Sequence, residues 1–177
     1  MITEEDAFEL LKKHKLPEGI IEHSKGVLKT SIIIIKRLKK NGVKVDEKKT
    51  RIAAILHDIG RVHTLRDGPT PEFGDRRHER HSVDILKKEG LPEIAEIVAK
   101  HGYFFFDHKS ENLTIEEKIL ILADLTTKEG KNVSLQERKE YVVNKYLAAK
   151  DNNTAERFDK NWHQIEELEK EIEAMIK

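Results

Sequence analysis

Polar side chains stand directly after two of the most apolar runs in this sequence. Asp124 follows residues 119–123, which are all aliphatic, and the pair His57-Asp58 follows the apolar residues 52–56. Burying a carboxylate costs free energy unless it is paired, hydrogen-bonded or bound to a metal ion. The two positions are therefore candidates for a buried site.

Three further histidines stand at the same kind of position. His23 shares a helical stripe with Val27, and His81 and His101 lie near the start and the end of two later predicted helices. A single histidine on an apolar face is more often a core residue than a ligand. Imidazoles and carboxylates from several helices together favour a hard or borderline divalent ion.

Arginine is concentrated just after the His-Asp pair. Arg61 stands three residues after Asp58 and is the arginine that we favour for a role in the site. Its planar guanidinium group suits phosphate oxygens. The alternative for the other arginines between 61 and 80 is a solvated loop with surface ion pairs.

Composition limits the remaining possibilities. The chain has 177 residues, 33 basic and 33 acidic side chains, nine histidines and no cysteine. The absence of cysteine excludes disulfides, thiolate metal sites and thiol catalysis, so a metal site must use His, Asp and Glu. No apolar run approaches the roughly 18 residues of a membrane span. We expect a single domain over 1–177 in the cytoplasm.

The elements that must position these residues are predicted to be helices, which gives an all-α fold. Capping boxes at Thr114 and Ser134, an N-cap at Asp46 and the Asn41-Gly42 stop mark four of the boundaries. The run 119–123 is apolar all round and predicts a central, buried helix. No segment alternates like a strand. The predicted helices cover about 3–14, 18–40, 46–60, 79–89, 92–102, 114–125, 134 onward and 154–177.

The order of these residues resembles the HD-domain superfamily of metal-dependent phosphohydrolases, and within it small stand-alone members. The resemblance runs through His23, the segment His57-Asp58-Ile59-Gly60-Arg61, His81, His101 and Asp124. It covers roughly 18–130, which we expect to form a compact helical bundle of the HD-domain type. The helices over about 134–177 are expected to pack on it.

The resemblance implies divalent ions at the centre of the bundle. His23, His57, Asp58 and Asp124 match the ligands of one-metal members. His81 and His101 match the additional ligands of two-metal members, so two ions (Mn, Fe, Co, Ni or Mg) are expected. His78 is a rival for His81 if its helix begins early, because residues three apart share a helix face.

The implied reaction is hydrolysis of a phosphomonoester or phosphoanhydride in a nucleotide-like substrate. Such ions activate a water molecule and hold phosphoryl oxygens. Asp58 and Arg61 are the expected catalytic residues, and Arg61, Lys25 and Lys128 the expected phosphate contacts. The expected partner is a small phosphorylated compound. The sequence leaves open whether the protein forms a homodimer.

Three alternatives remain at this point. The domain could bind a nucleotide as a catalytically silent regulatory module. It could be a nucleic-acid-directed phosphodiesterase that uses residues 11–51, where the local net charge is +9, although zero total charge disfavours this. It could also be a purely structural helical protein.

Overall fold

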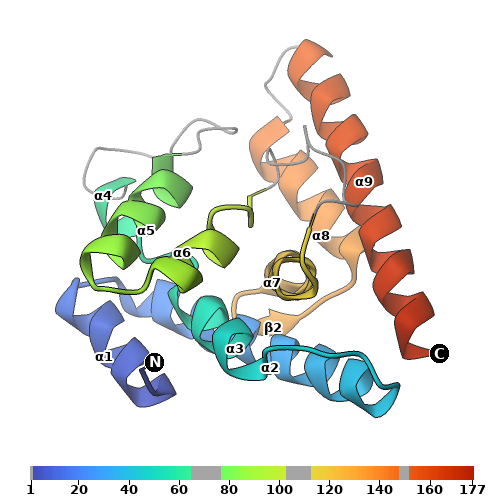
Figure 1. The fold of residues 1–177 in the computed structure, drawn as a ribbon. Coiled ribbons are helices and arrows are strands. Elements are labelled where there is room, and N and C mark those ends of the chain that lie inside the picture. The colour runs from blue at the N-terminus through green and yellow to red at the C-terminus, as the bar shows by residue number, and fades with distance from the viewer. Residues whose placement is uncertain (1, 65–76, 103–112, 148–151) are drawn as a thin grey trace.

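The computed structural model describes residues 2–64, 77–102, 113–147 and 152–177, and in these the fold is all-α, as predicted (Figure 1). The two loops predicted over 61–77 and 103–113 lie mostly outside the described residues, as does the aromatic run 103–106, but residues 61–64 of the first form a short helix instead. The helices are α1 (Glu4–Lys13), α2 (Glu18–Lys40), α3 (Glu47–Leu56), α4 (Arg61–Thr64), α5 (Arg77–Lys88), α6 (Pro92–Val98), α7 (Ile115–Leu125), α8 (Leu135–Val142) with a π-helical extension (Val143–Leu147), and α9 (Asn152–Ile176).

Local signals define most helix ends. The side chains of Thr3, Thr114 and Ser134 each accept a hydrogen bond from the backbone N–H three residues later, and the acidic residue at that position bonds back. These capping boxes satisfy N–H groups that a helix start would otherwise leave unpaired. At the end of α2, Gly42 has a φ of 79°, a conformation that glycine adopts without a steric penalty.

Helix α7 lies at the centre of the molecule. It is seen end-on in Figure 1, with α2 and α3 below it, α5 and α6 to one side and α8 and α9 to the other. It contacts α2, α3, α6 and α9. Residues 119–123 are all buried, which confirms the prediction of a central buried helix. The carboxylate of Asp124, near the end of α7, therefore lies in the interior of the bundle.

Two departures from the predicted boundaries affect the site. Helix α3 ends at Leu56 rather than near Gly60, because the chain turns at His57 and Asp58 and begins the short helix α4. Helix α5 begins at Arg77, about two residues earlier than expected. Both differences change which side chains face the centre.

A small hairpin that the sequence did not predict follows α7. Strand β1 (Thr127–Lys128) pairs antiparallel with β2 (Lys131–Asn132), and the turn places Glu129 and Gly130 at φ values of 50° and 74°. Strands of two residues are too short to give an alternating pattern. The hairpin sits against Gly26 of α2, where a Cβ atom would lie 2.7 Å from the Cα of Gly130.

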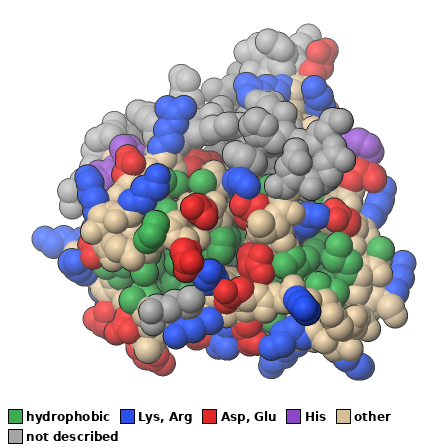
Figure 2. All heavy atoms as spheres, viewed as in Figure 1, with side chains coloured by type: hydrophobic (Ala, Val, Ile, Leu, Met, Phe, Trp, Pro, Cys, Tyr) green, Lys and Arg blue, Asp and Glu red, His purple; other side chains and the backbone are tan. Residues whose placement is uncertain are grey.

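The C-terminal helix closes one side of the core. Phe158, Trp162, Ile165, Leu168 and Ile172 of α9 are buried, and the helix contacts α2 and α7. Acidic and basic side chains are interspersed over the face shown in Figure 2. None of the helices described is both long and apolar enough to cross a bilayer.

Candidate metal centre

Six side chains from different elements meet at the centre of the bundle. They form two groups, and within each group the nitrogen and oxygen atoms that could bind a metal ion all lie within 4.8 Å of one another. The first group comes from α2, the turn after α3, and α7. The second comes from the same turn, α5 and the turn after α6. The groups are His23, His57 and Asp124, and Asp58, His78 and His101.

The first group is held together by Asp124. Its Oδ1 atom lies 2.9 Å from Nε2 of His23 and 3.6 Å from Nε2 of His57. His57 is fully buried, whereas the side chains of His23 and Asp124 are 16% and 14% exposed. Both are slightly more exposed than His78 of the second group, whose side chain is 11% exposed.

The second group surrounds Asp58. Oδ1 of Asp58 lies 3.6 Å from Nε2 of His78 and 3.7 Å from Nε2 of His101, and its Oδ2 lies 3.6 Å from Nε2 of His57. One carboxylate thus faces both groups. This is the position from which an aspartate could bridge two ions.

Backbone carbonyls fix two of the histidine rings. Nδ1 of His57 donates to the carbonyl of Ala54 at 2.9 Å, and Nδ1 of His101 donates to that of Val98 at 2.6 Å. In its neutral form each ring therefore directs the lone pair of Nε2 to the centre. Metal-binding histidines are commonly held in this way by an acceptor on the other nitrogen.

Four atoms that face the centre are buried without a hydrogen bond: Nε2 of His57, His78 and His101, and Oδ1 of Asp58. Buried polar atoms normally have partners, so a concentration of unpartnered ones needs an explanation. Imidazole nitrogens and carboxylate oxygens are ligands for divalent ions such as Zn²⁺, Mn²⁺ and Fe²⁺. The donor set fits one ion in each group.

The carboxylates of the site are held in the ionised form. Burial opposes ionisation of Asp58, but the charge of Arg61 and the neighbouring imidazole of His57 outweigh it, and the pKa of Asp58 lies well below its usual range. Burial likewise opposes ionisation of Asp124, but its hydrogen bond with His23 and the neighbouring imidazole of His57 outweigh it and lower the pKa of Asp124. Two ionised carboxylates in an apolar surrounding favour a bound cation.

The histidines of the second group are shifted in opposite directions. Burial and the nearby charge of Arg61 lower the pKa of His78 to about 3. Burial also opposes protonation of His101, but the nearby carboxylates of Asp58 and Glu79 raise its pKa to about 9. The two rings thus differ in electrostatic environment although both face Asp58.

Of the predicted phosphate contacts, only Arg61 touches this cluster among the described residues. Its Nε donates to Oδ2 of Asp58 at 2.5 Å. Burial opposes the charge of Arg61, but the carboxylate of Asp58 outweighs it and raises the pKa of Arg61. Lys25 is exposed and pairs with Glu22 on the surface of α2. Lys128 lies 4.4 Å over the ring of Tyr141.

The structure brings His78, and not the favoured His81, to the centre. His81 instead stacks against His63, with their ring centroids 4.7 Å apart. The cause is the early start of α5, because the buried face then runs through His78, Ser82 and Ile85. His81 also stands four residues before Ile85, so the spacing in the sequence left both histidines open.

Sequence reasoning also missed three residues around the cluster. Glu79 is buried beside His78, and Ser82 is buried under the His-Asp turn. The positive charge of Arg138 on α8 acts on His23 and lowers its pKa, although the hydrogen bond to Asp124 leaves that pKa raised overall. No motif marks these residues, because their roles depend on which helices pack together.

Ser82 connects α5 to the turn that carries His57 and Asp58. Its Oγ donates to the carbonyl of His57 at 2.8 Å and accepts from the N–H of Gly60 at 2.9 Å. We expect Ser82→Ala to lower the free energy of unfolding by about 2–3 kcal/mol, because two buried backbone groups lose their partner. Urea unfolding of the metal-free protein measures this.

Ser31→Ala is the matched control. Ser31 is equally buried, but its hydroxyl has no hydrogen-bond partner. Its removal should therefore leave the unfolding free energy within about 0.5 kcal/mol of the wild type. Equal losses in the two variants would contradict the role of Ser82.

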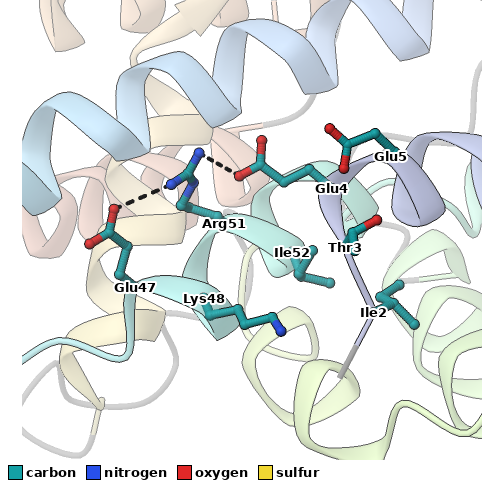
Figure 3. A pocket seen from close by; sticks show the side chains of 8 residues that line it. All are labelled: Ile2, Thr3, Glu4, Glu5, Glu47, Lys48, Arg51 and Ile52. Carbon is teal, nitrogen blue, oxygen red and sulfur yellow. Dashed lines mark hydrogen bonds and ion pairs between the residues drawn. The ribbon is translucent and has the colours of Figure 1, made fainter.

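A separate pocket of about 550 Å³ lies between the start of α1 and α3 (Figure 3). Arg51 spans it, with ion pairs to Glu4 at 2.5 Å and to Glu47 at 3.3 Å. None of the six clustered residues lines this pocket. Its side chains hold α1 against α3, and we assign no chemistry to it.

The fold and the site together define an all-α protein with a central candidate metal centre. A family model described as "HD domain" matches residues 20–128. The chain therefore belongs to the HD domain family, which suggests metal-dependent phosphohydrolase activity in general. Comparison with curated proteins and with solved structures gave no match.

Proposed function

We propose that this protein is a metal-dependent phosphohydrolase that cleaves a phosphomonoester or phosphoanhydride bond in a nucleotide-like substrate. The observation that carries the proposal is the convergence of four buried, unpartnered ligand atoms from three segments of the chain: the turn after α3, helix α5 and the turn after α6. In a site that served only as structural core, polar atoms without partners would lower the stability of the fold. An open cation site accounts for them.

His23, His57 and Asp124 would hold one ion, and Asp58, His78 and His101 a second. When bound, divalent ions supply Lewis-acid chemistry: they lower the pKa of coordinated water and neutralise charge on phosphoryl oxygens. The ligand set thus includes His78 in place of His81.

Side chains and backbone groups of this chain would position the ligands and the substrate. Asp58 lies between the two groups and fixes their separation. The carbonyls of Ala54 and Val98 keep two rings in the tautomer that faces the centre. Arg61 places a positive charge beside Asp58, which favours an anionic substrate over a neutral one. We therefore rank Arg61 before Lys25 and Lys128 as the phosphate contact.

Phosphate release from a panel of nucleotides tests the proposal. The panel contains nucleoside mono-, di- and triphosphates, dinucleoside polyphosphates and cyclic nucleotides, each with Mn²⁺, Co²⁺, Ni²⁺ or Mg²⁺. We expect turnover of at least one compound by the wild type and none by Asp58→Ala. Silence across the panel with metal bound would contradict catalysis and favour the regulatory alternative, and failure to bind any metal would contradict the site itself.

A further inference from the structure

The three fully or largely buried histidines of the centre share one arrangement. In each, Nε2 faces the cluster without a hydrogen bond. His57 and His101 achieve this because Nδ1 donates to the backbone carbonyl three residues earlier. His78 has a different neighbour at Nδ1, namely Oε2 of Glu79 at 3.0 Å.

Glu79 is held in a specific place beside the second group. It is 8% exposed, and its Oε2 atom has no aligned hydrogen bond but lies 3.0 Å from Nδ1 of His78. Its Oε1 atom lies over Gly102, where an added Cβ would be 2.0 Å away. The carboxylate therefore fits only because residue 102, directly after His101, has no side chain.

We infer that Glu79 is a positioning residue that holds His78 in the tautomer and orientation needed to bind a cation with Asp58 and His101. The inference rests on the proposed metal centre. A carboxylate at Nδ1 stabilises the N–H on that nitrogen and directs the Nε2 lone pair toward Asp58. It does for His78 what the carbonyls of Ala54 and Val98 do for the other two rings.

The consequence is an asymmetry between the two groups. In the part of the chain that the structure describes, Glu79 contacts His78 and lies against Gly102, both of which belong to the side of the second group. A carboxylate is a stronger acceptor than a carbonyl and increases the basicity of the ring it holds. Glu79 should thus tune the cation affinity of the second group alone.

Titration of the metal-free full-length chain with Mn²⁺ by calorimetry tests this inference without relying on turnover. The His23→Ala background weakens the first group, so that binding reports on the second. In that background we expect Glu79→Ala to weaken binding on the order of 10–100-fold. Glu79→Gln should lose less, because an amide oxygen at the same place keeps an acceptor beside Nδ1. Glu96→Ala, which removes an exposed glutamate of α6, should change nothing.

Gly102→Ala provides an independent route to the same effect. The new methyl group would displace the Glu79 carboxylate, so binding should weaken as in Glu79→Ala. In the double variant Glu79→Ala/Gly102→Ala the two losses of affinity should not add, because the carboxylate that the new methyl group would displace is already absent. A purely structural role of Glu79 would instead give additive losses, no recovery with glutamine and weaker binding at both groups.

The outcomes separate this inference from the proposed function. Wild-type protein that binds two ions, with unchanged affinity in Glu79→Ala, overturns the role of Glu79 and leaves the metal centre standing. Wild-type protein that binds no ion overturns both. Selective loss at the second group, partly recovered by Glu79→Gln, supports both.

Discussion

Asp58→Ala is expected to lose phosphohydrolase turnover by more than about 10³-fold, because residues that act as one unit fail together when one is removed. The carboxylate faces three imidazoles, and its Oδ2 accepts a hydrogen bond from Arg61 at 2.5 Å. Its removal takes a ligand from the second group and the fixed link between the groups. Calorimetric titration with Mn²⁺ should show weaker binding at both.

The same change should also destabilise the metal-free fold. Arg61 is half-buried, with 33% of its side chain exposed, and would lose the carboxylate that compensates its charge. Removing one partner of a fully buried ion pair costs about 3–5 kcal/mol, and the solvent that reaches Arg61 should bring the loss below that range. Asp58→Asn keeps the shape of the side chain and separates the loss of charge from the loss of packing.

Asp84→Ala is the matched control for Asp58→Ala. Asp84 is an exposed carboxylate on α5, and its removal should leave metal affinity and turnover at the wild-type level. Full activity in Asp58→Ala would show that the site has been assigned to the wrong residues. Equal losses in both variants would point to a general effect of charge.

Gly60→Ala is expected to lower the free energy of unfolding by about 3 kcal/mol or more, as overpacking against backbone does. A Cβ atom at this position would lie 2.1 Å from the carbonyl oxygen of His78 and 2.3 Å from the amide nitrogen of Ser82. These are backbone atoms, so rotation of a side chain cannot relieve the contact. Helix α5 would have to move away from the turn.

That movement should also weaken metal binding, because α5 carries His78 and Glu79. Urea unfolding and Mn²⁺ titration of the same preparation measure both effects. Gly19→Ala is the control: an added Cβ there has no atom within 4 Å, and alanine in a helix is favoured by up to about 1 kcal/mol over glycine. A Gly60→Ala variant as stable as wild type would contradict the close packing of α5.

The sequence determined the helices and indicated most residues of the candidate metal centre. Capping residues such as Thr114 and Ser134 fixed helix starts, because their side chains satisfy backbone groups of the same turn. Asp124 and the His57-Asp58 pair were recognisable because each follows a run of buried aliphatic residues. The cost of burying a carboxylate and the apolar run before it are local features of the sequence. They can be recognised without knowing which helices pack together.

Only the tertiary structure decided between His78 and His81. The two residues lie three positions apart, about 4.5 Å along the helix axis and roughly 60° apart around it. Which of them faces Asp58 depends on where α5 begins and how it packs on the turn through Gly60 and Ser82.

Glu79 became meaningful in the same way, since its neighbour Gly102 is distant in the sequence and adjacent only in the folded chain. Which side chain of a helical bundle becomes a metal ligand depends on the rotation of each helix about its axis and on how closely the backbones approach. These are set by contacts between helices, and no single segment of sequence contains them.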